Sequence, residues 1–454
     1  MPQLGSSAPS SRIALVDPYD SGSLYAPALR ERGALCWRIE SNPWVPESVR
    51  GRLDESLFEA SHIHRDLGES LEVLRHWRVD RVVAGSETGV LLADRLSAAL
   101  GLPGNGTALS VPRRDKAAMA VTAAAAGLAV PAQAVSGDPD VLVRWARDHD
   151  RWPVVVKPVD SLDSDGVRLC ANENEIASAA DELLGRRNRA GQTNERLIVQ
   201  ETLTGPQYVV DTVSLDGDHH LATLWRYTRP QRAREWLDEV RDRRQAPDAD
   251  GELRAYAAIG SDGKQILPAD GQRHRRLVDY TFALLDALGV RHGPAHCELV
   301  WEREGHPDEG PRLMEIGIRL HGAPRTHWLT RLCAGRDQVE LAVDALLDPG
   351  AFRRKVAERY HLARHGRMVR LTPWRTGTLR RFRRLDEVRA LPSFHEVVSL
   401  GEPGPLRRVM GVIALLHPDA DGVERDAARI RALEAEGLYE LATPPDEVRR
   451  SSNR

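Results

Sequence analysis

Residues 296–319 read HCELVWEREGHPDEGPRLMEIGIR, in which two apolar, strand-like runs flank a turn rich in Gly, Pro and Asp. This pattern predicts a β-hairpin. Glu298 and Glu315 are equidistant from a turn centred between His306 and Pro307, so a regular register places them directly opposite each other. Opposed residues share one face of the sheet, with Cβ atoms about 4.5–5.5 Å apart. The hairpin therefore predicts two carboxylates that point into the same space.

Two like charges in these positions destabilise a sheet and raise one carboxyl pKa unless a cation lies between them. Mg²⁺ suits the positions, because it takes oxygen ligands from one or two carboxylates and from substrate phosphates. A register slip of one residue would instead turn one glutamate towards solvent. Arg319 follows at the end of the second strand. Its guanidinium could hold a carboxylate or a phosphoryl group through two hydrogen bonds. The alternative is an ordinary surface arginine.

The beginning of the chain alternates strands with helices. Apolar runs at 12–16 and 81–85 are each followed by a helical pattern that closes at a glycine. This alternation predicts a parallel α/β first domain that ends near residue 110. Ligands gather beyond the carboxyl ends of such strands. The loops from Ser21 to Tyr25 and from Ser86 to Thr88 are therefore candidate substrate edges, although plain turn chemistry explains them equally well.

The remaining 340 or so residues are long enough for about two further packed units. We expect an Ala-rich helix after 113, a long amphipathic helix over 275–290, and a solvated, charged excursion at 234–253. From about 350 the chain is Arg-rich, with short strand-like runs and a final helix near 423–437, which predicts a small α+β cap. Buried strands are expected at 152–158, 197–201 and 208–215.

Lysine is rare in this chain. Only four of the 63 Lys and Arg residues are lysines, namely Lys116, Lys157, Lys264 and Lys355. Arg cannot replace Lys where a compact ammonium must contact a phosphate. Lys157 ends the strand VVVKP, and we expect it, but not Lys264, to face the loop that follows.

That loop contains Ser161, Ser164 and Gly166, whose backbone N–H groups and hydroxyls are suited to phosphate oxygens. Asp163 and Asp165 oppose this interpretation, and an ordinary turn between two strands is the alternative. The Walker pattern of a phosphate-binding loop is absent.

Composition excludes several functional classes. Lys+Arg 63 against Asp+Glu 66 gives no basic surface for nucleic acid or an anionic membrane. The four dispersed cysteines form neither a metal pattern nor a disulfide framework. No apolar run of about 18 residues and no leader pattern occurs. We therefore expect a soluble, cytoplasmic enzyme that acts on small molecules, and the sequence does not reveal its oligomeric state.

The motifs, in their order and spacing over roughly 113–330, resemble the ATP-grasp superfamily of ligases. They are RRDKAAM (113–119), WPVVVKPVDSLDSDGV (152–167), VQETLTGPQYVVD (199–211), AHCELVW (295–301) and LMEIGIRLHG (313–322). The flanking stretches VDPYDSG and GSETGV are similar to the bacterial L-amino-acid ligases, which form dipeptides and related amides, often in secondary metabolism. The resemblance implies an ATP-grasp fold of α/β and α+β type, with a Rossmann-like domain over 1–110, a core over 111–350 (lobes 111–195 and 196–350) and a cap over 351–454.

The resemblance also implies roles for individual residues. Two lysines and the loop from Ser161 to Gly166 would bind the phosphates of ATP. The backbone from Glu201 to Leu203, at the hinge between the two lobes, would bind the adenine. Two glutamates would hold Mg²⁺ or Mn²⁺. Arg319 would be catalytic and would steady the substrate carboxylate and acyl phosphate beside Gly322 and Ala323. The implied ATP-binding residues are Lys116, Lys157, Ser161, Ser164, Gly166, Glu201, Thr202, Leu203 and Gln207, and the implied metal ligands are Glu298 and Glu315.

Two positions depart from the family pattern. Gln207 stands where the family often has a ribose-binding glutamate, and Gly317 stands where many members have an asparagine in E-I-N-x-R. The implied reaction joins a carboxylate, from an amino acid or similar molecule, to an amine through an acyl phosphate. The alternatives are a biotin-carboxylase-like or purine-pathway ligase and an ATP-binding regulatory protein. The sequence does not identify the base that deprotonates the amine, for which the candidates are Asp211, His292, His296 and His321.

Overall fold

The computed structural model describes residues 11–42, 53–162, 164–230, 235, 237, 261–323, 325–373 and 377–442. Most of the charged excursion expected at 234–253 lies outside these residues, as does Asp163. No helix in the described ranges is long and apolar enough to cross a membrane.

The first domain is a four-stranded parallel sheet in the order β3-β2-β1-β4, as the alternation of strands and helices predicted. Because the strands are parallel, their carboxyl ends meet at one edge of the sheet. In α4, Leu92 and Leu96 are buried, whereas Leu91 is 39% exposed. The elements are β1 (Arg12–Val16), η1 (Asp20–Leu24), α1 (Tyr25–Glu31), β2 (Leu35–Glu40), η2 (Glu55–Leu57), β3 (Ser61–Ile63), α3 (Leu67–Trp77), β4 (Arg81–Ala84), η3 (Glu87–Gly89) and α4 (Val90–Leu100).

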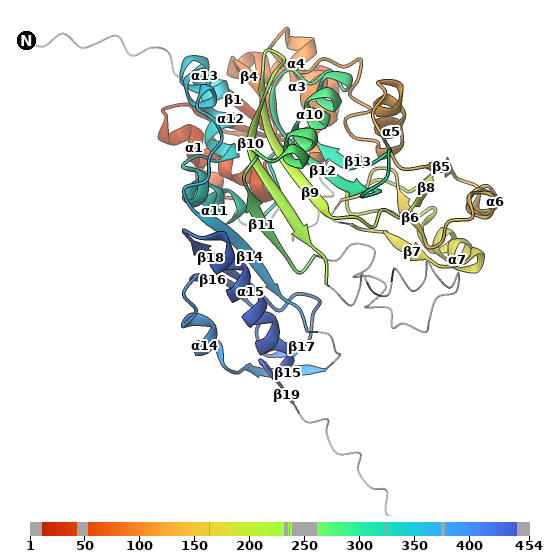
Figure 1. The fold of residues 1–454 in the computed structure, drawn as a ribbon. Coiled ribbons are helices and arrows are strands. Elements are labelled where there is room, and N and C mark those ends of the chain that lie inside the picture. The colour runs from red at the N-terminus through yellow and green to blue at the C-terminus, as the bar shows by residue number, and fades with distance from the viewer. Residues whose placement is uncertain are drawn as a thin grey trace, which may run out of the picture.

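A second, antiparallel sheet in the order β5-β8-β6-β7 forms a small lobe, drawn in yellow at the right of Figure 1. Its apolar side chains pack against α6 and α7. The lobe begins with α5, whose first turn is capped by the Asp115 carboxylate. The elements are α5 (Lys116–Ala125), β5 (Gln133–Ser136), α6 (Pro139–His149), β6 (Val154–Pro158), β7 (Arg168–Cys170), α7 (Glu173–Leu183) and β8 (Leu197–Glu201).

The largest element is an eight-stranded antiparallel sheet in the order β13-β12-β9-β10-β11-β14-β18-β16. Helix α10 packs on one face of its first half through an extensive apolar cluster, and α11 and α12 pack on parts of the other face. The elements up to residue 357 are β9 (Gln207–Leu215), β10 (Asp218–Thr228), β11 (Gly263–Leu267), α10 (Gln272–Ala287), β12 (Gly293–Glu302), β13 (Gly310–Gly317), α11 (Arg325–Ala334), α12 (Gln338–Leu347) and α13 (Pro349–Ala357).

The C-terminal part extends this same sheet. Strands β14, β18 and β16 continue it beyond β11, while β17, β15 and β19 form a separate three-stranded sheet. Helix α15 completes a distinct apolar core there, drawn in blue at the bottom of Figure 1. The division of the chain near 350 remains a proposal, supported by this separate core. The elements are β14 (His365–Leu371), β15 (Thr378–Phe382), α14 (Leu385–Arg389), β16 (Phe394–Leu400), β17 (Gly404–Pro405), β18 (Gly411–His417), α15 (Ala420–Ala435) and β19 (Tyr439–Leu441).

The β12–β13 hairpin is present, but its register is not regular. Near the turn, Leu299 lies opposite Leu313, so this part of the hairpin is centred on His306 and not between His306 and Pro307. Continued without interruption, this register would place Glu298 opposite Met314. Glu315 would then point to the other face of the sheet.

A β-bulge corrects the register. The pairing shifts between Glu298 and Leu299, so that Met314 has no direct partner and Glu315 lies opposite Glu298. One extra residue in a strand changes the face of every side chain beyond it. The predicted opposition of the two glutamates is therefore confirmed, although the regular hairpin from which it was deduced is wrong.

A buried ion pair joins the first domain to the core. Arg113 is 1% exposed, and it donates to the Asp94 carboxylate on α4 through Nη2 at 2.9 Å and Nε at 3.2 Å. Its Nη1 donates to the carbonyl of Leu288, at the end of α10, at 2.8 Å. Burial raises the pKa of Asp94, although Arg113 opposes the shift. The carboxylate therefore depends on this arginine.

We expect Arg113→Met to lower the free energy of unfolding by about 3–5 kcal/mol, because it leaves the buried Asp94 charge without its cation. Denaturant titration measures the change. Arg147→Met is the matched control, since Arg147 forms a solvent-exposed pair with Glu173 and should have little effect. Equal stability of the two variants would show that the Asp94–Arg113 pair does not hold the first domain to the core.

Candidate active site

One cavity of about 390 Å³ between the small lobe and the eight-stranded sheet gathers most of the predicted site residues. Gly166 is not among the residues that line it. Its φ of 75° is left-handed, and a Cβ there would lie 2.9 Å from Pro158, so this glycine shapes the loop from behind. The predicted residues that line the cavity are Lys116, Lys157, Ser161, Ser164, Glu201, Thr202, Leu203, Gln207, Glu298, Glu315, Arg319, Gly322 and Ala323.

Two lysines project into the cavity from different elements of the small lobe. Lys157 lies on β6, and Lys116 is the first residue of α5. Lys116 Nζ donates to the carbonyl of Ser161 at 3.0 Å and lies 3.3 Å from Glu315 Oε2. Burial lowers the pKa of Lys157 to about 8, although Glu315 opposes the shift. The side of the cavity that faces the two glutamates is therefore cationic at neutral pH.

Asp165, in the loop after β6, lines the cavity and is held by hydrogen bonds within the small lobe. Asp165 Oδ2 accepts hydrogen bonds from the Ser161 hydroxyl and the Arg189 backbone N–H, both at 2.8 Å. Ser164 adopts a left-handed φ of 60°. Asp165 therefore helps to fix the shape of this loop through its two hydrogen bonds.

The segment from Glu201 to Leu203 leaves β8 and crosses to the large sheet. The Glu201 carboxylate accepts from the backbone N–H of Ala132 at 2.9 Å, so this side chain braces the segment. The Thr202 hydroxyl donates to the carbonyl of Pro153 at 2.7 Å, and the Leu203 carbonyl accepts from Arg229 at 3.1 Å. Both side-chain contacts fix a backbone that borders the cavity where two sheets meet.

A chain of hydrogen bonds crosses the large sheet beneath the cavity. Gln207 Nε2 donates to Glu298 Oε2 at 2.7 Å, and Glu298 Oε1 lies 3.2 Å from His296 Nε2. His296 Nδ1 lies 2.9 Å from Asp211 Oδ1, and Asp211 Oδ2 lies 2.7 Å from His321 Nδ1. The pairing of β9 with β12 places Asp211 beside His296 and so aligns the chain.

This network keeps its carboxylates ionised. Burial opposes ionisation of Asp211, but His321 and His296 lower its pKa well below the ordinary value. Burial likewise opposes ionisation of Glu298, whose pKa is lowered by His296 and Arg319. Asp211, His296 and His321 are close enough to hold a metal ion. Their facing atoms, however, are hydrogen-bonded to one another, and Trp225 Nε1 also donates to Asp211 at 2.9 Å.

The carboxylates of Glu298 and Glu315 fit a hard divalent cation better. They lie opposite each other on one face of the hairpin, with side chains 18% and 33% exposed towards the cavity. Oxygen donors from two carboxylates, with room for phosphate oxygens and water, are what Mg²⁺ takes in nucleotide sites.

Arg319 lies between the core and the first domain. Its Nη2 is 3.4 Å from Glu87 Oε2, and its Nη1 donates to the Leu320 carbonyl at 3.0 Å. Burial opposes ionisation of Glu87, but Arg114 and Arg319 lower its pKa to about 2. A Cβ at Gly317 would lie 3.3–3.4 Å from the Arg319 guanidinium. The glycine that departs from the family pattern therefore gives this arginine room against the strand.

The cavity also contains residues that the sequence analysis did not identify. Lys264 lines it and is 8% exposed, and its Nζ contacts His321 and Thr326. Asp20 and Glu87 reach the cavity from the two first-domain loops proposed as substrate edges. Tyr227 and Arg370 come from β10 and β14. Rarity of lysine was the one sequence signal that could have indicated Lys264.

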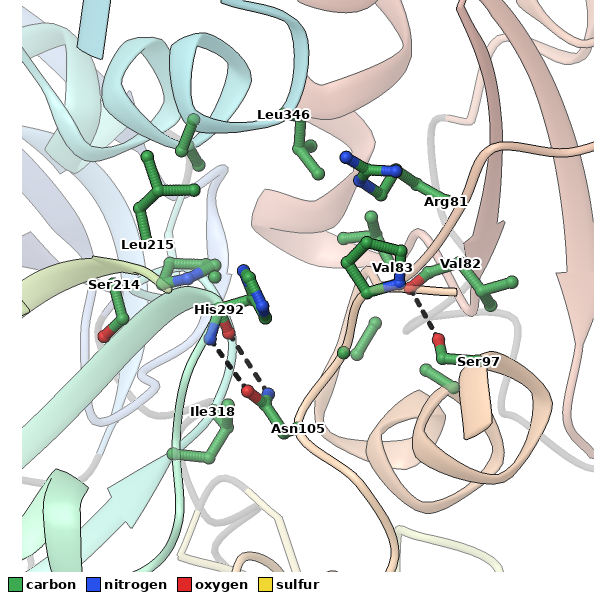
Figure 2. Close-up of a pocket in the computed structure, with 18 of the residues that line it drawn as sticks. Arg81, Val82, Val83, Ser97, Asn105, Ser214, Leu215, His292, Ile318 and Leu346 are labelled. Atoms are coloured by element: carbon green, nitrogen blue, oxygen red, sulfur yellow. Dashed lines mark hydrogen bonds between the residues drawn. The ribbon is translucent and has the colours of Figure 1, made fainter. Parts of the chain in front are cut away.

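His292, one of the candidate bases, lies elsewhere. It lines a second cavity of about 160 Å³ between the first domain and the core. Asn105 fixes its backbone by two hydrogen bonds, at 2.8 and 3.1 Å, and Figure 2 shows both, with Val82, Val83 and Leu346 across the space. This mainly apolar cavity shares no lining residue with the first, so His292 is withdrawn as a candidate base.

Known proteins resemble the chain over nearly its whole length. Dapdiamide A synthase of Enterobacter agglomerans is 26% identical over 447 residues, which cover 94% of this chain and 97% of that protein. The L-amino acid ligase of Bacillus licheniformis superposes with a TM-score of 0.66 at 17% identity, covering 96% of this chain and all of that one. N5-carboxyaminoimidazole ribonucleotide synthetase of Staphylococcus aureus, in complex with ADP, gives 0.59 at 12%, covering 93% and 98%. No protein-family model matches the chain.

These structures share the ATP-grasp fold, and the chain has this fold over its full described length. The chain is thus similar in sequence to a synthase, and in fold to a ligase and a synthetase of known structure.

We expect ADP to bind less tightly as the pH rises through about 8, because the Lys157 ammonium then loses its proton and the β-phosphate loses a cation. Calorimetric titrations at pH 7 and pH 9 measure the change. Lys157→Met should bind ADP weakly with little difference between the two pH values. Lys355→Met is the control, since Lys355 pairs with Glu340 and Asp344 outside the cavity. A wild-type affinity that does not change with pH would contradict the role of Lys157.

Proposed function

We propose that this protein is an ATP-dependent ligase that joins the carboxylate of an amino acid or similar molecule to an amine, through an acyl phosphate, with release of ADP and phosphate. The observation that carries the proposal is the convergence of Glu298, Glu315, Lys116, Lys157 and Arg319 on one cavity. Two carboxylates facing three cations form a site for a phosphoryl group and its metal ion. Phosphoryl transfer to a carboxylate needs no protein nucleophile.

The nucleotide would lie between the two sheets. Its adenine would meet the backbone from Glu201 to Leu203, which two side chains already hold in place. Its phosphates would lie against Lys116, Lys157 and the loop that contains Ser161 and Ser164. Gln207 donates to Glu298, so its amide orients this carboxylate, and its carbonyl oxygen remains available for the ribose. Mg²⁺ held by Glu298 and Glu315 would offset charge on the transferring phosphoryl group.

The substrates would enter from the side of the first domain. Asp20 and Glu87 border the cavity there, and the Ala323 backbone N–H donates to Asp20 at 3.2 Å. Arg319, held by Glu87, would position the substrate carboxylate, with Gly322 and Ala323 beside it. The names of the two amide-forming relatives, dapdiamide A synthase and L-amino acid ligase, support amino-acid-like substrates.

We expect the products to be ADP and phosphate, without AMP or pyrophosphate. With a carboxylate substrate labelled with ¹⁸O, one labelled oxygen should appear in the released phosphate, because the acyl phosphate breaks at its carbonyl carbon. Mass spectrometry of the phosphate measures the transfer. Amide formation with ADP but without label transfer would exclude the acyl phosphate, and ADP formation with bicarbonate alone would favour a carboxylating ligase.

We expect Glu298→Gln and Glu315→Gln each to lower the turnover rate by roughly 10²-fold or more and to raise the Mg²⁺ concentration for half-maximal activity, because each removes one ligand charge but keeps the side-chain size. Glu304→Gln is the matched control, since Glu304 pairs with Arg273 in the turn of the same hairpin, outside the cavity. Steady-state rates over a Mg²⁺ titration decide the matter. An unchanged Mg²⁺ dependence in both variants would overturn this metal site.

A further inference from the structure

Lys264 has no role in the phosphoryl transfer described above, yet it is buried in the same cavity. It lies on β11, opposite Tyr227 on β10 and Met368 on β14. Its Nζ lies 2.6 Å from Thr326 Oγ1 and 3.0 Å from His321 Nε2. No carboxylate in the described residues lies within ion-pairing distance of it. A buried lysine without a counter-ion is costly as a cation, so this one requires an explanation.

The partners of Lys264 suit a neutral amine. His321 Nδ1 lies 2.7 Å from the ionised Asp211 carboxylate and therefore carries the ring proton, which leaves Nε2 as an acceptor. Lys264 then donates one N–H to His321 and another to the Thr326 hydroxyl. A neutral amine has only two N–H groups, so both are used and its lone pair remains free.

The charged groups around Lys264 are those of the cavity. Burial is the main cause that lowers the pKa of Lys264, and the nearby cation Arg370 on β14 lowers it further. Asp211 on β9, Glu298 on β12 and Asp20 at the start of η1 raise this pKa, but by less. The net effect lowers the pKa of Lys264 to about 7, whereas an ordinary lysine titrates near 10.4. Both protonation states are therefore accessible at neutral pH, which is what a general base requires.

We propose that Lys264 is the catalytic base that removes a proton from the ammonium group of the incoming amine, and that His321 and Asp211 position it. This inference rests on the proposed amide-forming function and names the base that the sequence left open. The Tyr227 hydroxyl lies 3.1 Å from the same nitrogen, His321 Nε2, and shares this acceptor with Lys264. The candidates Asp211 and His321 thus act through Lys264 and not on the substrate.

The proton balance of the step is simple. The amine arrives as an ammonium ion and transfers one proton to Lys264. Its nitrogen lone pair then attacks the acyl-phosphate carbonyl carbon, the bond from this carbon to the phosphate oxygen breaks, and the second proton leaves with the phosphate as hydrogen phosphate. Lys264 returns its proton to water before the next turnover.

Hydroxylamine separates this step from the formation of the acyl phosphate. It is largely unprotonated at neutral pH and therefore needs no base to attack the acyl phosphate and form a hydroxamate. We expect Lys264→Arg to lower amide formation with an amino acid by on the order of 10²–10³-fold, while hydroxamate formation with the same carboxylate changes by less than about fivefold. Arg keeps the positive charge but cannot accept a proton at this pH. Lys355→Arg, outside the cavity, is the control and should leave both reactions unchanged.

Two results would overturn the assignment. Amide formation retained by Lys264→Arg would mean that only the charge matters. Loss of both reactions in Lys264→Arg and also in the smaller Lys264→Met would place Lys264 in the first half of the reaction. A wild-type enzyme that gives no hydroxamate with any carboxylate would contradict the proposed function itself, so the two failures are distinguishable.

The pH profile supplies a readout that a structural role would not produce. The rate constant kcat/KM for the amine should rise with pH through about 7 as Lys264 loses its proton, and this limb should stay at the same pH for amines of different basicity. It should be absent with hydroxylamine and absent in Lys264→Arg. A limb that moves with the pKa of the amine would report the substrate alone and would overturn the role of Lys264.

Discussion

The structure is organised around the repulsion between two carboxylates held on one face of a hairpin. Glu298 and Glu315 are directly opposed, and a pair of like charges in this position is unfavourable unless cations surround it. Lys116 and Lys157 come from the small lobe, and Arg319 comes from the strand end beside Glu315. The negative charge of the two glutamates is therefore offset by two lysines from across the cavity and by one arginine beside the hairpin. The same arrangement makes the cavity attractive to a metal ion and a polyphosphate together.

The use of lysine in a chain that otherwise uses arginine follows from the same cavity. Three of the four lysines line it, where burial lowers the pKa of two of them to about 8 and about 7. Arginine would stay charged at both positions and would present a broad fork instead of a point charge. Lys157 faces the carboxylates and the phosphate loop, whereas Lys264 faces an imidazole and a hydroxyl. In the proposed reaction, one residue type would thus provide a phosphate contact on one side of the cavity and a proton acceptor on the other.

Local sequence patterns predicted the parts of the site that depend on one strand or one turn. The parallel first domain, the hairpin and the strand that ends at Lys157 could all be read from periodicity and turn residues, and the ATP-grasp fold from the motifs. The bulge at Met314 could not, because the local pattern of LMEIGI fits a strand of regular alternation as well, and only the pairing in the sheet shows the shift. Lys264 could not be predicted either, and for Glu87 and Asp20 the pattern indicated only the loops in which, or beside which, they lie. They reach the cavity through the order β12-β9-β10-β11 and through contact between domains, and neither of these is encoded in any local pattern.

The two departures from the family pattern fit an active enzyme once their neighbours are considered. A glutamate at 207 would place a third carboxylate against Glu298, whereas Gln207 donates a hydrogen bond to it at 2.7 Å. A side chain at 317 would press on the guanidinium of Arg319, which here lies close to the strand and pairs with Glu87. Both changes reduce the net negative charge around Glu298 and Glu315. Gln207 removes one negative charge, and Gly317 allows the Arg319 cation to lie nearer. A site that loses one metal ligand but keeps two glutamates and three cationic side chains still has the charge balance that phosphoryl transfer requires.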